Sequence, residues 1–263
     1  MVYLVCNYKY CGVKTLIFLI DLPNPTHGMS NVNLAILTEF SKSNQKVKTI
    51  NTVPSYAANF FTSRFWGVFK ICHTLFCFLH FFVSSTFNLG GVVYRPINGG
   101  YGQLYDLIYI LMCRLFKNKI YIHHHSFDYL NSRSPLFEIL NKLAGKCSTH
   151  IVLGKKMGTL LTELYGVKEE NIKIVSNLAF FEVQPPDKSV KNDTKIKVGH
   201  LANLCIEKGV DIFINICRSL HSNKINFSAV IAGPCVDDTT KKLVLDAVKE
   251  LPQLRYVGPL YAE

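Results

Sequence analysis

The sequence predicts an α/β protein built from two Rossmann-like domains with parallel sheets, the second of them incomplete. Short apolar segments rich in β-branched residues alternate with amphipathic helical patterns, and this order is typical of parallel strands connected by covering helices. The 263 residues are 49% hydrophobic, which is enough apolar surface for one large core or two moderate ones.

Nine segments have the composition expected of strands. They are residues 15–20, 46–51, 91–95, 119–124, 149–153, 171–175, 194–201, 226–232 and 254–257. Helical patterns lie between most of them, and the clearest apolar stripes begin at Met157 and at Val210. Because helices separate the strands along the chain, neighbouring strands are expected to run parallel.

The segment FFEVQPPDKSVKNDTK, residues 180–195, interrupts this alternation with two prolines and mixed charges. Such composition is typical of a linker between domains. We therefore expect domains at residues 1–182 and 183–263. The second is left with about three strands and two helices, which is short for a Rossmann-like domain.

Charge is distributed unevenly along the chain. The net charge is +11, and residues 1–180 hold 18 Lys and Arg against 8 Asp and Glu. A field of this sign favours phosphate-rich partners such as nucleic acid, anionic lipid headgroups or a nucleotide diphosphate. Charge alone does not choose among them.

Nine cysteines are scattered without a CxxC pair or a His/Cys spacing suited to zinc. This pattern indicates reduced, mostly buried thiols in a cytoplasmic protein.

Two apolar segments could be mistaken for membrane-spanning segments. TLIFLI, after Lys14, is too short to span a bilayer and reads as a buried strand. Phe65–Val83 is long enough, but Lys70, His73 and His80 interrupt it, and such residues are costly inside a membrane. A helix lying half in the domain and half on an anionic membrane surface fits this segment, and an ordinary core helix is the alternative.

Loops after strands are the candidate ligand sites, because Rossmann-like folds bind ligands at the carboxyl ends of their strands. In the first such loop, Gly28 would let backbone approach a ligand, and Ser30 or Asn31 could cap the next helix. A capped structural turn would use the same residue types. Asn177 follows the last strand of the first domain, where a capping role is favoured over ligand contact.

Three consecutive histidines end the fourth predicted strand. Strand alternation places His123 and His125 on one face and His124 on the other. Adjacent strand residues cannot all face one ion, so a metal site is not expected. A histidine here could bond a sugar hydroxyl or a phosphate, or could belong to the core or the surface.

Lys208 and Gly209 stand directly before a strongly patterned helix. The free N–H groups and positive end of a helix favour an anion, and the lysine adds a mobile charge. A diphosphate is the natural ligand for this arrangement, and a solvated lysine is the alternative.

Several of these segments together resemble the sequence motifs of a known enzyme family. LANLCIEKGVDIFINI resembles the donor-phosphate segment of the family 4 retaining glycosyltransferases of GT-B fold, with Asn203 in place of the usual arginine and Lys208 at the phosphate-binding lysine. Four other segments resemble that family in order and spacing: PNPTHGMSNVNLAIL, IYIHHHSF, IKIVSNLAF and AVIAGPCVDD. The resemblance extends over nearly the whole chain from Thr15.

The resemblance implies transfer of a sugar, with retention, from a nucleotide-sugar to a lipid-linked or oligosaccharide acceptor in cell-surface polysaccharide synthesis. It implies that Gly28, Asn203, Lys208 and Gly209 bind the donor. It also implies catalytic contacts from His125 or His123, and a hinge at Asn177. No cofactor, essential metal or nucleic acid is expected, and the cytoplasmic side of the plasma membrane is the expected location.

The ending YVGPLYAE departs from the family, whose members continue and carry two glutamates that hold the donor. Impaired transfer is therefore expected. A non-catalytic membrane- or partner-binding remnant is the alternative. A dinucleotide-dependent oxidoreductase is disfavoured, because HGMSNVN lacks the glycines of G-x-G-x-x-G.

Overall fold

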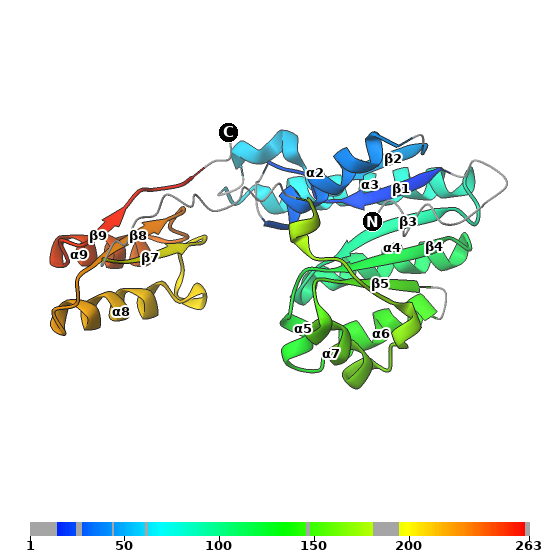
Figure 1. Cartoon of the computed structure of the whole chain (residues 1–263). Coiled ribbons are helices and arrows are strands. Elements are labelled where there is room, and N and C mark those ends of the chain that lie inside the picture. Colours follow the sequence, from blue (N-terminus) through cyan, green and yellow to red (C-terminus); the bar gives the residue numbers. More distant parts are fainter. Residues whose placement is uncertain are drawn as a thin grey trace. The chain divides into compact units, whose positions relative to one another are not determined.

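The computed structural model describes residues 15–24, 28–43, 45–60, 63–145, 148–180 and 195–260. The chain forms two compact units, Met1–Gln184 and Pro185–Glu263, and each contains one parallel sheet with helices (Figure 1). The predicted α/β class is confirmed. The predicted linker lies almost entirely outside the described residues.

The sheet of the first unit has six parallel strands in the order β2-β1-β3-β4-β5-β6. The strands are β1 (Leu16–Ile20), β2 (Val47–Asn51), β3 (Val92–Ile97), β4 (Lys119–His124), β5 (Ser148–Val152) and β6 (Ile172–Ile174). The chain passes from β1 to β2 on one side and then returns to β3 on the other. This reversal makes the carboxyl ends of β1 and β3 the topological switch point, where folds of this kind bind ligands.

Helices and short 3-10 turns connect these strands. The helices are α2 (Gly28–Ser41), α3 (Trp66–Thr86), α4 (Gln103–Leu115), α5 (Asp128–Asn131), α6 (Pro135–Ala144) and α7 (Lys155–Tyr165). The 3-10 turns are η1 (Ser55–Phe60), η2 (Gly100–Gly102), η4 (Glu169–Asn171) and η5 (Asn177–Phe180).

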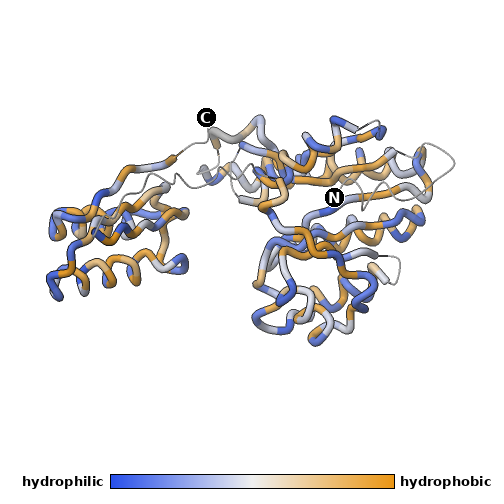
Figure 2. The backbone as a smooth tube through the Cα atoms, in the orientation of Figure 1, coloured by the Kyte–Doolittle hydropathy of each residue, from blue (hydrophilic) through white to orange (hydrophobic). Residues whose placement is uncertain are grey.

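Strand β1 shows why the central strands are continuously apolar. Leu16, Phe18 and Ile20 pack with α2 on one face of the sheet, while Ile17 and Leu19 pack with α3 and α4 on the other. Both faces are covered, so every residue of the strand is buried. Figure 2 shows the central strands of this sheet largely in the hydrophobic colour.

The second unit contains β7 (Ile196–Leu201), β8 (Phe227–Ala232) and β9 (Leu254–Tyr256), which are parallel in the order β7-β8-β9. The turn η6 (Ile206–Lys208) and the helices α8 (Val210–Ser222) and α9 (Asp238–Glu250) complete its described part. Phe227, Ala229 and Ile231 of β8 belong to one buried cluster with residues of both helices. All nine predicted strands are present, with bounds within two residues of those expected.

A buried polar chain crosses the face of the first sheet opposite to α2. His124 contacts Tyr129 through Nδ1 at 2.8 Å and His150 through Nε2 at 3.0 Å. His150 in turn contacts the Ser148 hydroxyl at 3.2 Å. Burial lowers the pKa of His124, and burial lowers the pKa of His150 from 6.5 to about 4.

The first prediction concerns acid stability. Between pH 6.5 and about 4 the unfolded chain protonates His150 but the folded chain does not, so the free energy of unfolding should fall as pH falls through this window. The slope from this residue should be about 1.4 kcal/mol per pH unit. Urea unfolding followed by Trp66, which lies in the first unit and is the chain's one tryptophan, measures it.

Replacing His150 by glutamine keeps a hydrogen-bonding side chain but removes the titration. His150→Gln should therefore reduce the slope by the contribution of this one residue, while His123 and His124, whose pKa values burial also lowers, still contribute. His221→Gln, at an exposed histidine of α8, is the matched control and should leave the slope unchanged. An identical slope in wild type and His150→Gln would contradict the assignment.

Candidate functional site

The switch point of the first unit is organised by a buried ion pair. Arg95 of β3 is 3% exposed, and its Nε and Nη2 donate to Asp106 Oδ1 at 2.9 and 2.7 Å. Its Nη1 donates to the Leu19 carbonyl at 3.2 Å and to the Thr52 hydroxyl at 3.1 Å. The guanidinium of Arg95 therefore links β3 to three other places: Leu19 in β1, Thr52 directly after β2, and Asp106 in α4.

Asp106 is fully buried in the first turn of α4 and accepts from a second partner. Asn98, just after β3, donates its backbone N–H at 2.9 Å and its side-chain amide at 3.0 Å. Burial raises the pKa of Asp106, and Arg95 and Asn98 oppose that rise. With four donated hydrogen bonds, Asp106 remains the carboxylate counter-ion of Arg95.

This pair was not among the residues predicted from the sequence. A signal was available, because Arg95 stands inside an apolar strand, VVYRPI, and a charge in such a place requires a buried partner. The partner itself could not be read from the sequence, since several acidic residues lie within reach along the chain.

The histidine strand has the predicted orientation. His123 lies with Tyr94 on the α2 face, with Nδ1 2.5 Å from the Tyr94 hydroxyl, and its ring is 4.0 Å from that of His125. His124 faces the other side, in the polar chain with His150. Burial lowers the pKa of His123 well below its usual value, so its imidazole is neutral at pH 7.

A neutral imidazole offers a hydrogen bond rather than a charge. His123 Nε2 is buried and has no hydrogen-bond partner among the described residues. This atom is therefore available to a hydroxyl or an amide of a ligand, or to an ordered water. Half-buried His125 lies beside it at the end of the strand.

Gly28 is exposed and begins α2, so Ser30 and Asn31 lie inside the first turn and the predicted cap is wrong. A Cβ added at Gly28 would meet nothing within 4 Å. The protein itself therefore imposes no steric need for glycine here, and a ligand requirement stays a prediction. Asn177 begins η5, and its Oδ1 is buried without a hydrogen-bond partner among the described residues.

The second unit carries the other predicted residues after the carboxyl end of β7. Lys208 is exposed at the end of η6, and Gly209 has a φ of 76° as it starts α8. This left-handed conformation favours glycine. Asn203 is also exposed and precedes η6.

A close backbone approach fixes the loop that contains Asn203. A Cβ at Gly233, after β8, would lie 1.8 Å from the Ala202 carbonyl oxygen, so only glycine fits. Tyr256 of β9 donates to the Gly233 carbonyl at 2.9 Å. Asp211 lies in the first turn of α8, three residues after Lys208, so a negative charge lies close to the lysine along the chain.

No family model and no curated protein match the sequence, but solved structures share its fold. One is described as the lipopolysaccharide outer core galactosyltransferase WaaB, apo form, with a TM-score of 0.57 and 12% identity over 94% of this chain and 69% of that one. MurG from Acinetobacter baumannii has a TM-score of 0.52 and 11% identity over 95% and 69%. UDP-GlcNAc 2-epimerase from Methanocaldococcus jannaschii has a TM-score of 0.51 and 16% identity over 94% and 74%.

These likenesses define the fold class. The protein has the GT-B architecture, with a second domain of which three strands are described. The chain spans about seven tenths of the length of the three similar structures. A galactosyltransferase and an epimerase both occur among them, so the chemistry must be argued from the site residues.

The second prediction tests the ion pair. Asp106→Ala leaves Arg95 buried without its counter-ion, so the first unit should lose about 3–5 kcal/mol in the free energy of unfolding. Urea unfolding followed by Trp66 measures the loss.

Glu138→Gln, which breaks the surface ion pairs of Glu138 with Arg133 and Lys142, is the control and should change the free energy of unfolding by much less than Asp106→Ala does. Equal stability of Asp106→Ala and wild type would show that the pair does not organise the switch point.

Proposed function

We propose that this chain is a glycosyltransferase that moves a sugar from a nucleotide-sugar to a glycan acceptor in cell-surface polysaccharide synthesis. The observation that carries the proposal is Lys208, exposed beside the left-handed Gly209 at the start of α8 in a GT-B fold. The likeness to a galactosyltransferase and to a UDP-GlcNAc 2-epimerase supports it, because both names refer to sugar chemistry and one to a nucleotide-sugar.

The start of α8 has the features needed to hold a diphosphate. Phe213 donates to the Gly209 carbonyl at 2.9 Å as the first bond of the helix, so the N–H groups of residues 210–212 have no acceptor within it. These groups, the helix dipole and the Lys208 ammonium would together stabilise the negative charge that develops on the leaving diphosphate.

Four further assignments belong to the more specific proposal of a family 4 retaining enzyme. Asn203 would stand in place of an arginine at the phosphates, which leaves Lys208 as the main cationic contact there. His123 and His125 would contact the transferred sugar through neutral imidazoles, and Gly28 would approach the donor. Asn177 would act as the hinge. No cofactor or essential metal takes part in this proposal.

The membrane part of the proposal rests on α3. Its Cys77 and Phe81 are buried in the core of the first unit, whereas Leu75, Phe76 and Leu79 on its other side are each more than 60% exposed. Helix α3 is the one described helix long and apolar enough to cross a bilayer, and 22% of its 18-residue apolar segment is buried in the protein. We propose that it lies flat on the cytoplasmic face of the plasma membrane, near a lipid-linked acceptor.

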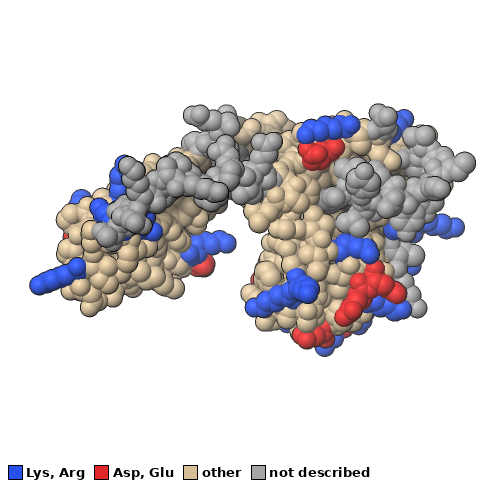
Figure 3. Space-filling view, viewed as in Figure 1, with Lys and Arg blue, Asp and Glu red and all other residues tan. Residues whose placement is uncertain are grey.

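Neighbouring residues fit this placement. Helix α4 packs against α3 through Tyr109, whose ring contacts Phe78 at 4.7 Å and Phe81 at 5.7 Å, and α4 also exposes Leu104 and Leu111. Arg64 and Lys70 would reach anionic headgroups. On the face shown in Figure 3, the described Lys and Arg side chains are spread over several places rather than aligned in one stripe, and nucleic acid is not proposed as a partner.

The third prediction tests donor binding and transfer. Lys208→Ala should weaken nucleotide-sugar binding and should lower any sugar transfer into a membrane extract by ~100-fold, the scale of losing one transition-state contact. Radiolabelled UDP-, GDP- and dTDP-sugars are the probes, with binding measured beside transfer. Lys241→Ala, at an exposed lysine of α9, is the matched control. Wild-type rates in Lys208→Ala would remove the assigned role.

The fourth prediction tests membrane docking by flotation with anionic liposomes. Binding should weaken as salt rises, since each basic residue near the surface contributes ~1 kcal/mol. Leu79→Glu should reduce binding, and Leu245→Glu, at an exposed leucine of α9, should not. Equal binding to neutral liposomes at every salt concentration would contradict the electrostatic part. Liposome binding without any nucleotide-sugar binding would favour the non-catalytic alternative.

A further inference from the structure

A small cavity lies at the switch point of the first unit, and none of the site residues predicted from the sequence lines it. Its volume is about 80 Å³, and it lies among the residues that follow β1, β2 and β3 and the facing sides of α3 and α4. Six of the lining residues matter for its chemistry: Asp21, Thr52, Lys70, Arg95, Tyr105 and Tyr109. All of them belong to the first unit.

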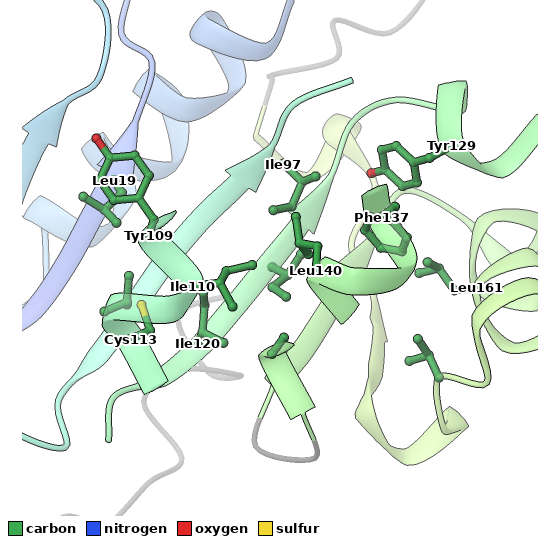
Figure 4. Close-up of a cluster of buried hydrophobic side chains, with 14 of the residues drawn as sticks. Leu19, Ile97, Tyr109, Ile110, Cys113, Ile120, Tyr129, Phe137, Leu140 and Leu161 are labelled. Atoms are coloured by element: carbon green, nitrogen blue, oxygen red, sulfur yellow. The ribbon is translucent and has the colours of Figure 1, made fainter. Parts of the chain in front are cut away.

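Tyr109 of α4 lines this cavity and carries a hydroxyl that has no hydrogen-bond partner among the described residues. The residue is 1% exposed, and its hydroxyl oxygen is buried. The ring is held by Phe78 and Phe81 on α3, and the Arg95 guanidinium carbon lies 5.0 Å from its centre. Figure 4 shows this ring beside Leu19, with the hydroxyl directed out of the apolar cluster.

A buried hydroxyl without a partner destabilises the folded chain. The contacts with Phe78, Phe81 and Arg95 hold the ring in this position. A ligand hydroxyl or an ordered water that enters the cavity would complete the hydrogen bond of the Tyr109 hydroxyl.

The other polar groups limit what can enter. Arg95 is already bonded to Asp106, Leu19 and Thr52, so its charge is balanced inside the protein. Asp21 accepts a hydrogen bond from the Thr52 hydroxyl through Oδ1. The Lys70 ammonium lies 5.7 Å from the centre of the Tyr105 ring at the cavity.

The charges of the cavity therefore cancel. Asp21 opposes Lys70, and Asp106 opposes Arg95. A phosphate would meet the Asp21 carboxylate, and a cation would meet Lys70. A neutral hydroxyl suits both ends, because it donates to a carboxylate and accepts from a phenol.

We propose that this cavity binds hydroxyl groups of a neutral sugar, which donate to Asp21 and accept from the Tyr109 hydroxyl. The volume holds several groups the size of water, such as a hydroxymethyl or two neighbouring hydroxyls, but not a whole sugar ring. The rest of the ring would lie against Tyr105. That the sugar is the end of the acceptor glycan rests on the proposed function.

The fifth prediction tests the cavity with methyl glycosides of glucose, galactose and N-acetylglucosamine. Saturation-transfer NMR on the full chain should detect binding of at least one glycoside. Tyr109→Phe should weaken it by ~10-fold, the effect of one hydrogen bond. The same change should leave the thermal midpoint equal to or above that of wild type, because it removes an unpartnered buried hydroxyl.

Two further variants sharpen the test. Asp21→Asn should also weaken glycoside binding, because the amide is a poorer acceptor than the carboxylate. Tyr101→Phe changes a tyrosine that is 88% exposed and is the matched control. It should bind like wild type.

Several results would overturn the proposal. They are no glycoside binding by wild type, equal binding by Tyr109→Phe, displacement of the glycoside by inorganic phosphate, and a lowered thermal midpoint in Tyr109→Phe. Nucleotide-sugar binding by the same samples separates the two proposals. Donor binding without glycoside binding removes only the cavity, whereas glycoside binding without donor binding removes only the transfer reaction.

Discussion

The guanidinium of Arg95 holds together the part of the first unit where a ligand is expected. It reaches β1 through Leu19, the residue after β2 through Thr52, and α4 through Asp106. Removing such a charge from water is unfavourable unless its partners are fixed. The strand ends around the switch point are therefore held in one arrangement, and the cavity beside Tyr109 depends on that arrangement.

The histidines of β4 do not add to the positive charge of the first unit. His123 and His124 are buried, and burial keeps both neutral at pH 7. His123 can orient a hydroxyl through Nε2, whereas both ring nitrogens of His124 already contact Tyr129 and His150. Neither neutral imidazole can neutralise a phosphate. In the proposed reaction the diphosphate charge consequently falls to Lys208 and the start of α8, while the first unit contributes hydrogen bonds.

The GT-B fold alone does not select a reaction. A galactosyltransferase and an epimerase share it with this chain at 12% and 16% identity, and function resides in the side chains at the strand ends. Residues such as Tyr109 and His123 matter for this reason. Each holds a buried polar atom without a hydrogen-bond partner among the described residues, and a ligand or an ordered water can contribute the missing bond at such an atom.

The sequence by itself determined the α/β class, the nine strands and the opposite facing of His123 and His124. These features follow from local periodicity, because a continuous apolar run is required wherever both faces of a strand are covered. The strand order, the Arg95–Asp106 pair and the cavity were decided only by the tertiary structure. Leu19 and Thr52 lie 76 and 43 positions from Arg95 along the chain, and no local pattern encodes which distant groups converge on one guanidinium. That convergence is fixed by the packing of α3 and α4 on the completed sheet.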